Sequence, residues 1–297
     1  MFLRKLILTA LIISIMSGAA FAALYSDLQL GTRASALGGA FVTLARDADA
    51  IYWNPAALGL AKKSNAMFMY SDVFNVGIKQ SYLAYSQPMS TLGLGASWLC
   101  HSSDLEEGFA ATQKTNSWVD DMYSIALGSK VKQDLYAGIN VKRFKVKTDR
   151  SSVSNVGTSG TGFDLGLLLT NLGKSDNSYV SDVSIGFQVR NLATDLSGEN
   201  VDPSFKLGIS SKIYDDLLMA VGLDMDNDNE DQSQKIRVNM GAEYNFNNTL
   251  FIRLGLNNGD FTTGFGLLLK EQLSIDYAFE KSLGELNSDN HRFSLSF

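Results

Sequence analysis

Residues 236–246 read IRVNMGAEYNF and alternate strictly between two kinds of side chain. The apolar set consists of Ile236, Val238, Met240, Ala242, Tyr244 and Phe246. A period of two is typical of a β-strand that has one apolar face, whereas an α-helix would repeat every 3.6 residues. The stretch therefore predicts a strand whose two faces meet different surroundings.

The same alternation recurs from Asn65 to the end of the chain. Counting such runs predicts about fourteen strands, an even number within the range of outer-membrane β-barrels. The expected spans are 64–72, 76–87, 91–101, 119–130, 134–147, 160–171, 181–191, 204–213, 217–225, 235–245, 249–257, 261–269, 272–280 and 290–297. In the fifth span the apolar parity shifts between Val141 and Phe144, which predicts a β-bulge there.

The connections between the predicted strands fall into two classes. The short turns are 88–90, 132–133, 215–216, 247–248 and 270–271. They alternate with long polar segments at 102–118, 148–159, 192–203, 226–234 and 281–289, and segment 172–180 is longer than its class predicts. Short turns at one end and long loops at the other indicate a transmembrane barrel, and a Greek-key sandwich would not sort its loops this way. A secreted β-sandwich is the alternative.

Composition excludes other classes of protein. The 297 residues carry a net charge of −6, a balance that argues against nucleic-acid binding, since a nucleic-acid binder would normally show a basic patch. Beyond the N-terminus no run of about 20 apolar residues exists, so a helical membrane bundle is excluded. A barrel fits the mean hydropathy near zero, because its apolar and polar residues alternate.

The N-terminus predicts export from the cytoplasm. Arg4 and Lys5 precede an apolar core at 6–16, and Ala20-Phe21-Ala22 has the pattern of a cleavage site. We therefore expect residues 1–22 to be a signal peptide and the mature chain to start at Ala23; a membrane anchor is the alternative. Cys100 is the only cysteine, so no intramolecular disulfide can form.

The two faces of the predicted strands have different roles in a barrel. The apolar face must meet lipid, because a closed ring leaves no backbone group unpaired. The opposite face would line the lumen with charges of both signs, from Asp164, Arg190, Lys206, Lys212, Arg237, Glu243, Arg253 and Asp276. Inward positions also hold Gly166, Gly186, Gly208, Gly222, Gly241, Gly255 and Gly266. Glycine weakens a strand unless another backbone approaches closely, which predicts an internal plug; barrel curvature is the plainer explanation.

The candidate for the plug is the segment before the first strand. Residues 31–61 read GTRASALGGAFVTLARDADAIYWNPAALGLA and show no alternation. Asn54 can cap a short helix whose first position Pro55 suits, and residues 34–45 could form another helix interrupted by Gly38-Gly39. We therefore expect an all-β transmembrane antiparallel barrel at 64–297 with a short helical hatch at 23–63 in its lumen.

This segment resembles a known family. Gly31-x-Arg33-Ala34-x-x-Leu37-Gly38-Gly39-Ala40-Phe41, then Asp47-Ala48-x-Ala50, then Asn54-Pro55-Ala56-x-Leu58, looks like the N-terminal hatch of the FadL/TodX long-chain fatty acid transporters. It looks closer still to their relatives, the PorV/PorQ-type outer-membrane proteins. The resemblance implies a fourteen-stranded barrel of the Gram-negative outer membrane that is plugged by its hatch. The hatch-motif residues are Gly38, Gly39, Asp47, Trp53, Asn54 and Pro55, either structural or close to a ligand.

Two functions follow from the resemblance. The first is passive uptake of small hydrophobic compounds, with a hydrophobic ligand and outer-membrane lipid as partners. The second is a scaffold or shuttle role beside the subunits of a protein secretion or surface-attachment system. The chain ends in Phe297 with Phe293 and Leu295 on the same face, which resembles the signal that barrels present to the insertion machinery.

Enzymatic and metal sites find little support. His101 and His291 are the only histidines, and a hydrolase site at His291 with Asp289 has no nucleophile motif beside it. The acidic run that begins at Asp224 and Asp226 lacks the glycine and glutamate of a calcium loop, so a solvated loop is expected there; weak surface binding of a divalent cation is the alternative. We expect no catalytic residue, no metal and no cofactor.

Overall fold

The computed structural model of the protein describes residues 29–73, 77–107, 114–150, 153–172, 179–196, 199–228, 233–270, 272–281 and 289–297. The predicted signal peptide lies outside these residues and stays a prediction. None of the helices in the described ranges is long and apolar enough to cross a bilayer.

The described residues form three short helical elements followed by strands. The helical elements are α2 (Thr32–Ala36), α3 (Ala50–Trp53) and the 3₁₀-helix η1 (Pro55–Leu60). The strands are β1 (Asn65–Val73), β2 (Ile78–Met89), β3 (Leu92–Glu107), β4 (Lys114–Lys132), β5 (Leu135–Arg150), β6 (Val153–Leu172), β7 (Val180–Leu196), β8 (Glu199–Val201), β9 (Ser204–Ile213), β10 (Leu217–Asp228), β11 (Ser233–Phe246), β12 (Leu250–Asn257), β13 (Asp260–Leu269), β14 (Leu273–Lys281) and β15 (Asp289–Ser296).

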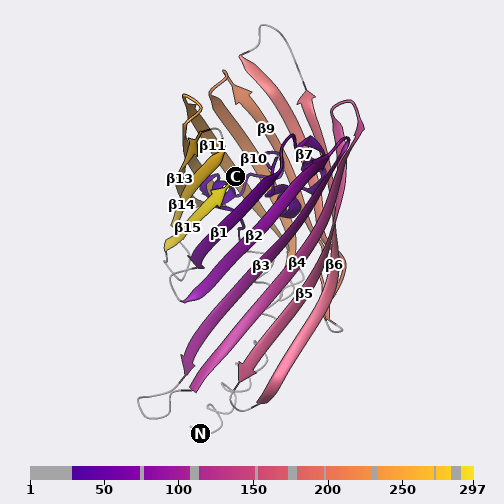
Figure 1. The fold of residues 1–297 in the computed structure, drawn as a ribbon, viewed down its shortest axis with the longest axis vertical. Coiled ribbons are helices and arrows are strands. Elements are labelled where there is room, and N and C mark those ends of the chain that lie inside the picture. Colours follow the sequence, from indigo (N-terminus) through magenta and orange to yellow (C-terminus); the bar gives the residue numbers. More distant parts are fainter. Residues whose placement is uncertain are drawn as a thin grey trace.

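The strands close into a ring. Each long strand is antiparallel to the strands before and after it, and β1 pairs with β15 from Met67 opposite Ser296 to Asp72 opposite His291. The three-residue β8 pairs with β7 and lies outside the ring, so fourteen of the described strands build a closed antiparallel barrel. Figure 1 shows the strands tilted in the wall, with β3–β6 extending beyond their neighbours at the lower end.

The fourteen strands of the ring correspond one to one to the fourteen predicted spans. The main difference is length, because β3–β7 continue into segments expected to be loops. Residues 102–107, 114–118 and 153–159 are strand, since cross-strand pairing continues where the side chains turn polar. The end of the barrel that carries these extensions is called the loop end below, and the end with the short turns and Phe297 the turn end.

The bulge predicted in β5 is wrong. Val141 pairs with Ile125 and Phe144 with Met122 in an unbroken register, and burial alternates through the same stretch. The parity of apolar residues shifts because the surroundings change: Phe144 is buried inside the barrel, whereas Arg143 and Lys145 are exposed outside. The alternation of apolar residues therefore changes face although the strand itself is regular, because inward positions become apolar and outward positions become charged. The register shifts lie elsewhere: at Lys130/Lys132 of β4, at Thr148/Arg150 near the end of β5, at three places between β6 and β7, and at Ser181/Ser184 between β7 and β9.

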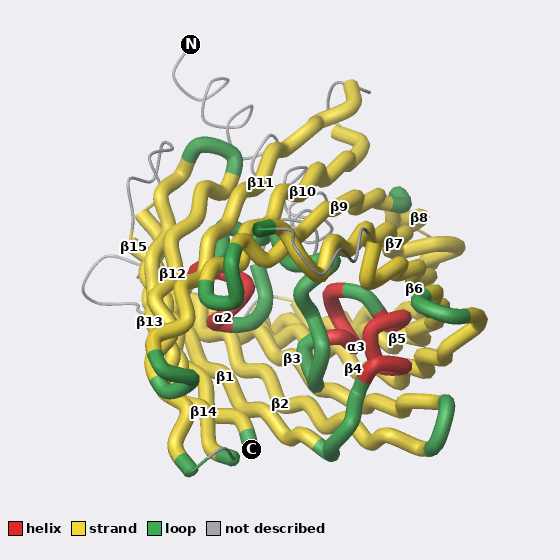
Figure 2. Tube along the Cα trace, turned by 90° about the horizontal axis from the view of Figure 1, so that it is seen from above, coloured by secondary structure: helices red, strands yellow, loops and turns green. Residues whose placement is uncertain are grey.

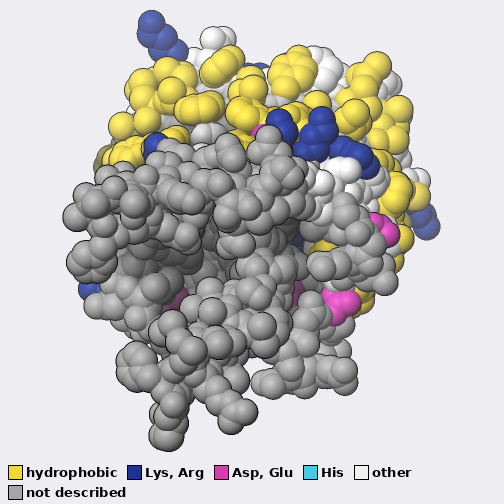
Figure 3. Space-filling view, turned by 90° about the horizontal axis from the view of Figure 1, so that it is seen from below, with side chains coloured by type: hydrophobic (Ala, Val, Ile, Leu, Met, Phe, Trp, Pro, Cys, Tyr) yellow, Lys and Arg dark blue, Asp and Glu magenta, His cyan; other side chains and the backbone are white. Residues whose placement is uncertain are grey.

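The two faces of the wall divide as predicted. Large apolar side chains are exposed on the outside, where Figure 3 shows them in yellow as a band around the visible part of the wall. On β12 the outward Leu254 is 51% exposed, whereas the inward Arg253 is 3% exposed. An exposed apolar band this extensive on a closed barrel is a surface for lipid, because soluble proteins rarely expose so large a patch.

An arginine at the middle of this band tests the lipid assignment. Leu254→Arg should reduce the free energy of unfolding from lipid vesicles by about 2–4 kcal/mol, because it buries a charge among acyl chains. The measurement is equilibrium denaturation of the refolded barrel in vesicles. Val131→Arg is the control, since Val131 is 62% exposed near the turn end of β4. It should cost about 1 kcal/mol or less at the interface, and equal costs for the two variants would contradict the assignment.

Candidate functional site

The described residues before β1 fold inside the barrel. Residues 29–61, called the inner segment below, carry α2, α3 and η1, and Figure 2 shows these helices within the ring of strands. α2 packs against β12–β15, and η1 packs against β2–β6. The segment therefore contacts opposite arcs of the wall.

Local sequence explains the turns of the inner segment. Gly38 and Gly39 have φ of 64° and 80°, a left-handed conformation that glycine adopts without strain, and they end the first helical turn. Asn54 accepts a hydrogen bond from Ala56 N at 3.2 Å, and Pro55 occupies the first position of η1. This is the cap predicted from the sequence. The helix α3 between them was not predicted, because only four residues form it.

An aromatic cluster forms the centre of the inner segment. The ring of Trp53 meets Phe41 and Tyr52 edge to face, with centroids 5.7 and 5.6 Å apart. Trp53 also donates its indole N–H to Leu30 O at 2.7 Å. All four residues are buried, and small alanines fill the space around them. The cluster gives a short segment a core of its own.

Glycines of the wall let the inner segment approach the strand backbones. A Cβ placed at Gly138 would overlap the backbone of Pro55, and one at Gly255 would overlap Gly38. The wall glycines whose Cβ would collide with the inner segment are Gly93, Gly95, Gly128, Gly138, Gly166, Gly186, Gly208, Gly241, Gly255 and Gly264. Gly222 and Gly266 were predicted to serve this purpose too. A Cβ at Gly222 would make only an ordinary contact with Ala40 at 3.5 Å, and Gly266 packs against Asp276 and Arg253 of the wall itself.

Charged side chains tie the inner segment to the wall. Arg33 donates two hydrogen bonds to Glu243, from Nε at 2.8 Å and from the terminal nitrogen at 2.7 Å. Arg253 bridges Glu243 and Asp276 at 2.6 Å each. Although burial opposes the charge of Arg33, the carboxylate of Glu243 outweighs it and raises the pKa of Arg33 above its ordinary value. The predicted neutralisation of the lumen by ion pairs is thus observed at these residues.

Hydrogen bonds to main-chain carbonyls add a second set of ties. The Asn54 amide donates to Val42 O at 3.0 Å within the inner segment and to Leu167 O of β6 at 3.1 Å. From the wall, Gln188 donates to Tyr52 O at 2.9 Å and Thr262 to Ala36 O at 3.2 Å. Asn54 is fully buried, so its polar atoms depend on these bonds.

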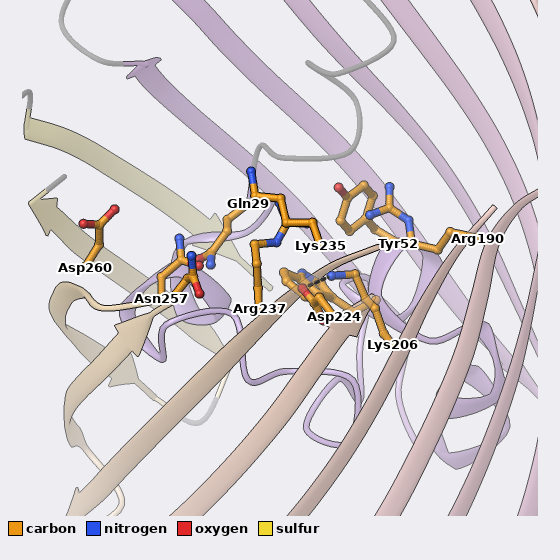
Figure 4. Close-up of a pocket in the computed structure, with 11 residues that line it drawn as sticks. Gln29, Tyr52, Arg190, Lys206, Asp224, Lys235, Arg237, Asn257 and Asp260 are labelled. Carbon is orange, nitrogen blue, oxygen red and sulfur yellow. Dashed lines mark hydrogen bonds and ion pairs between the residues drawn. The ribbon is translucent and has the colours of Figure 1, made fainter. Parts of the chain in front are cut away.

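A cavity of about 150 Å³ lies between the inner segment and the loop end. Tyr52 and Trp53 form part of its lining, and cations cover their rings: the Arg190 guanidinium is 4.3 Å from the Tyr52 centroid and Lys206 Nζ is 5.2 Å from Trp53. Figure 4 shows Arg190 beside Tyr52 and Lys206 directed at Asp224. The lining also contains Gln29, Lys235, Arg237, Asn257, Asn258 and Asp260.

This loop-end cavity combines positive charge with two aromatic rings. Arg190, Lys206, Lys235 and Arg237 line it together with two carboxylates, those of Asp224 and Asp260. Arg190 Nε is buried and has no hydrogen-bond partner among the described residues. The cavity can accept a small molecule through ring contacts and polar hydrogen bonds.

A second cavity of about 280 Å³ opens on the turn-end side. Arg33, Asp47 and Asp49 of the inner segment line it, together with Glu243 and Arg253 of the wall. Burial inside the barrel and the neighbouring Asp47 raise the pKa of Asp49 to about 7. The two cavities lie on opposite sides of the inner segment, because one is lined by loop-end residues and the other by turn-end residues.

The predicted hatch-motif residues are distributed around these features. Trp53 lines the loop-end cavity, Asp47 lines the turn-end cavity, and Asn54 and Pro55 pack against wall glycines. Gly38 packs against Leu256 and Gly39 against Gln29. The six predicted hatch-motif residues therefore do not converge on one pocket. Tyr52 was not predicted as a site residue, and Arg33 was named only as part of the family motif, although an arginine in an alanine-rich segment was a visible signal for an ion pair.

The other polar groups weighed in the sequence have structural surroundings. The Asp224 and Asp226 prediction is wrong, because both lie in β10 and pair with Lys206 and Arg237 instead of forming a solvated loop. His291 contacts the Tyr277 hydroxyl at 2.8 Å on the outer face. In the part of the chain that the structure describes, no cluster of three His, Cys, Asp or Glu side chains could hold a metal.

A methyl group at Gly138 tests the close approach of the inner segment. Gly138→Ala should lower the stability by about 1–3 kcal/mol, because the methyl group would push on the backbone of Pro55 and Ala56. Amide hydrogen exchange of residues 50–60 should become faster. In the control Gly157→Ala, the methyl group would meet only Val146 O at 3.9 Å and should change neither quantity. Unchanged exchange in both variants would show that the inner segment does not rest on the wall.

Removing the Asn54 amide tests the polar ties. Asn54→Ala leaves Val42 O, Leu167 O and Ala56 N without their bonds and should cost about 1–3 kcal/mol. Limited proteolysis should then cut the inner segment faster while the barrel remains intact. Ser64→Ala is the control, because its bond to Gln87 is exposed. A variant that resists protease like the wild-type protein would contradict the role assigned to Asn54.

Comparison with known proteins finds similarity in structure alone. No protein-family model matches the sequence, and no curated protein matches it either. The solved structure of the toluene transporter TodX of Pseudomonas putida is similar with a TM-score of 0.65 at 13% identity, over 91% of this chain and 97% of that one. The toluene transporter TbuX of Ralstonia pickettii is similar with a TM-score of 0.62 at 13% identity, over 90% and 96%.

A FadL homologue of Pseudomonas aeruginosa gives a TM-score of 0.62 at 12% identity, over 91% of this chain and 98% of that one. Identities this low establish the fold. The PorV/PorQ part of the resemblance stays a prediction from the sequence. The chain therefore has the barrel fold of the FadL/TodX group of transporters, and the similarity extends over nearly the whole length of both chains.

Proposed function

We propose that this protein is an outer-membrane channel for passive uptake of small, largely hydrophobic compounds, and that the inner segment is its hatch. The observation that supports this most directly is that the inner segment lies between the two cavities and contacts opposite arcs of the wall. A molecule that follows the lumen must pass this segment. The structural neighbours include two toluene transporters, which supports uptake over other barrel functions.

The loop-end cavity is the proposed first site for a compound. Its volume of about 150 Å³ matches a single aromatic ring, since an internal cavity of about that size can hold benzene. Tyr52 and Trp53 form part of the lining, and because Arg190 and Lys206 cover their ring faces, an aromatic compound would meet the ring edges, a contact that is favourable. The polar rim would orient a compound that carries one polar group.

The barrel type supports a proposal for the location of the protein and for the machinery that would insert it into the membrane. We place the chain in the outer membrane of a Gram-negative cell, with the short turns on the periplasmic side and the loop end outside, as is usual for such barrels. The insertion machinery would recognise β15 and Phe297, whose backbone pairs with Ala66. The predicted signal peptide at 1–22 is consistent with this route. The scaffold role stays an alternative from the sequence, and the transporter neighbours favour uptake over it.

Uptake by cells with a locked hatch tests the proposal. In a Cys100→Ser background, Ala40→Cys with Gly222→Cys would join the hatch to β10, because a Cβ at Gly222 lies 3.5 Å from Ala40 Cα. Host cells that produce the wild-type barrel should accumulate labelled toluene faster than cells without it. The disulfide should abolish this gain, and reduction should restore it.

Each single-cysteine variant is a matched control and should behave like the wild-type barrel. If the wild-type protein does not increase uptake, the transport proposal is wrong. If uptake is equal in the oxidised and reduced double variant, the inner segment is not a hatch that has to move.

A further inference from the structure

The outer face of β5 changes abruptly from apolar to basic. Its outward side chains are Ile139 and Val141, each 40% exposed, followed by Arg143, Lys145 and Lys147, all exposed. Alternate residues of a strand share a face and lie about 7 Å apart, so the three cations form a row. The row is called the basic row below, and it continues the same face that meets lipid.

Neighbouring strands hold the basic row against the wall. Arg143 donates to Thr161 Oγ1 at 3.0 Å and to Ser159 Oγ at 2.9 Å, both on β6. Lys145 Nζ lies 5.6 Å from the ring centroid of Tyr123 on β4. These contacts use only part of each cation, because a guanidinium has five donors and an ammonium three. The remaining donors face outward.

The charge of this surface is positive. Asp121 of β4 pairs in register with Lys145 and accepts the indole N–H of Trp98 at 2.8 Å. Asp195 of β7 is also exposed, and it pairs in register with Thr161, which accepts a hydrogen bond from Arg143. Among the described side chains, three cations and these two carboxylates leave a net positive surface on a chain whose net charge is −6. Figure 3, viewed toward the loop end, shows Lys and Arg side chains gathered beside the yellow apolar band.

The height of the basic row matches a layer of lipid headgroups. Trp98 and Tyr123 are partly exposed on β3 and β4 beside the row, and aromatic side chains mark the membrane interface of barrels. Arg143 follows the apolar Val141 by two residues, or about 7 Å along the strand. The cations therefore begin where the acyl chains end.

We propose that Arg143, Lys145 and Lys147 bind the phosphate groups of a phosphorylated glycolipid in the outer leaflet. This rests on the proposed orientation, which places the loop end outside. Arginine and lysine bind phosphate by charge-assisted hydrogen bonds, and the apolar surface at Ile139 and Val141 receives the acyl chains of the same lipid. Phosphate on a lipid fits both halves of the surface, whereas a soluble anion would use the basic half alone.

Native mass spectrometry of the purified barrel tests this binding. The probes are diphosphorylated lipid A, its dephosphorylated form, and phosphatidylglycerol. Wild-type protein should bind diphosphorylated lipid A at least tenfold more tightly than the other two at low salt. The triple variant R143Q/K145Q/K147Q should lose roughly 100-fold, since each basic residue near an anionic surface contributes about fivefold.

The control variant K130Q/K132Q/K270Q removes the same number of charges near the turn end and should bind lipid A like the wild-type protein. Heat-dependent electrophoretic mobility checks that each variant is folded. If the triple variant does not fold, the salt dependence of wild-type binding decides: affinity should fall steeply between 50 and about 500 mM salt.

Three results would overturn the proposal: unchanged lipid A binding by the folded triple variant, equal loss in the control variant, or equal wild-type affinity for phosphatidylglycerol. Toluene uptake by the triple variant should equal that of the wild-type protein, so a failure of this proposal is separate from a failure of the uptake proposal.

Discussion

The pairing of backbone groups is the constraint on which this structure depends, above all in the bilayer proposed above. Lipid offers no hydrogen bonds, so each N–H and C=O in the membrane must pair within the protein. The pairing of β1 with β15 meets that requirement by removing both edges of the sheet. A ring of fourteen strands, however, encloses more space than its own inward side chains fill. The inner segment fills part of that space, and the inward glycines allow its backbone to approach the strands closely.

The charged side chains inside the ring are neutralised by ion pairs. Arg33, Glu243, Arg253 and Asp276 form a chain of ion pairs that crosses from the inner segment to the wall. Burying any one of these charges alone would be costly, and removal of one partner leaves another unpaired. The network therefore favours one seating of the inner segment. Near the loop-end cavity the cations of Arg190 and Lys206 lie over the aromatic rings of Tyr52 and Trp53.

The barrel could be predicted from the sequence because alternation is a local property. Each run, such as 236–246, carries its own evidence for a strand, and fourteen runs imply closure. Strand ends were less predictable, because β3–β6 continue as polar hairpins that read as loops. The β5 error at Val141 and Phe144 has the same origin: residue polarity reports the surroundings of a strand, and these change along the barrel wall.

The candidate site could be predicted only in part. The Asn54 cap and Pro55 are local features, and both were found from the sequence. The pairing of Arg33 with Glu243 joins residues 210 positions apart, so it depends on the register of the closed ring. The same holds for Arg190 over Tyr52. Local pattern separated the inner segment from the strands, and only the assembled barrel shows what this segment contacts.

The reach of the inner segment also sets an order of assembly. Ala36 accepts a hydrogen bond from Thr262, 226 residues later, whereas η1 packs against strands that all end by residue 172. Contacts between distant residues form late, because a long loop must close first. The earliest part of the chain to be synthesised is thus the last that can finish packing. In a barrel of which only the first strands have formed, η1 could already pack, whereas α2 would still lack its partners β12–β15. Ring closure and the packing of the inner segment would therefore be completed together.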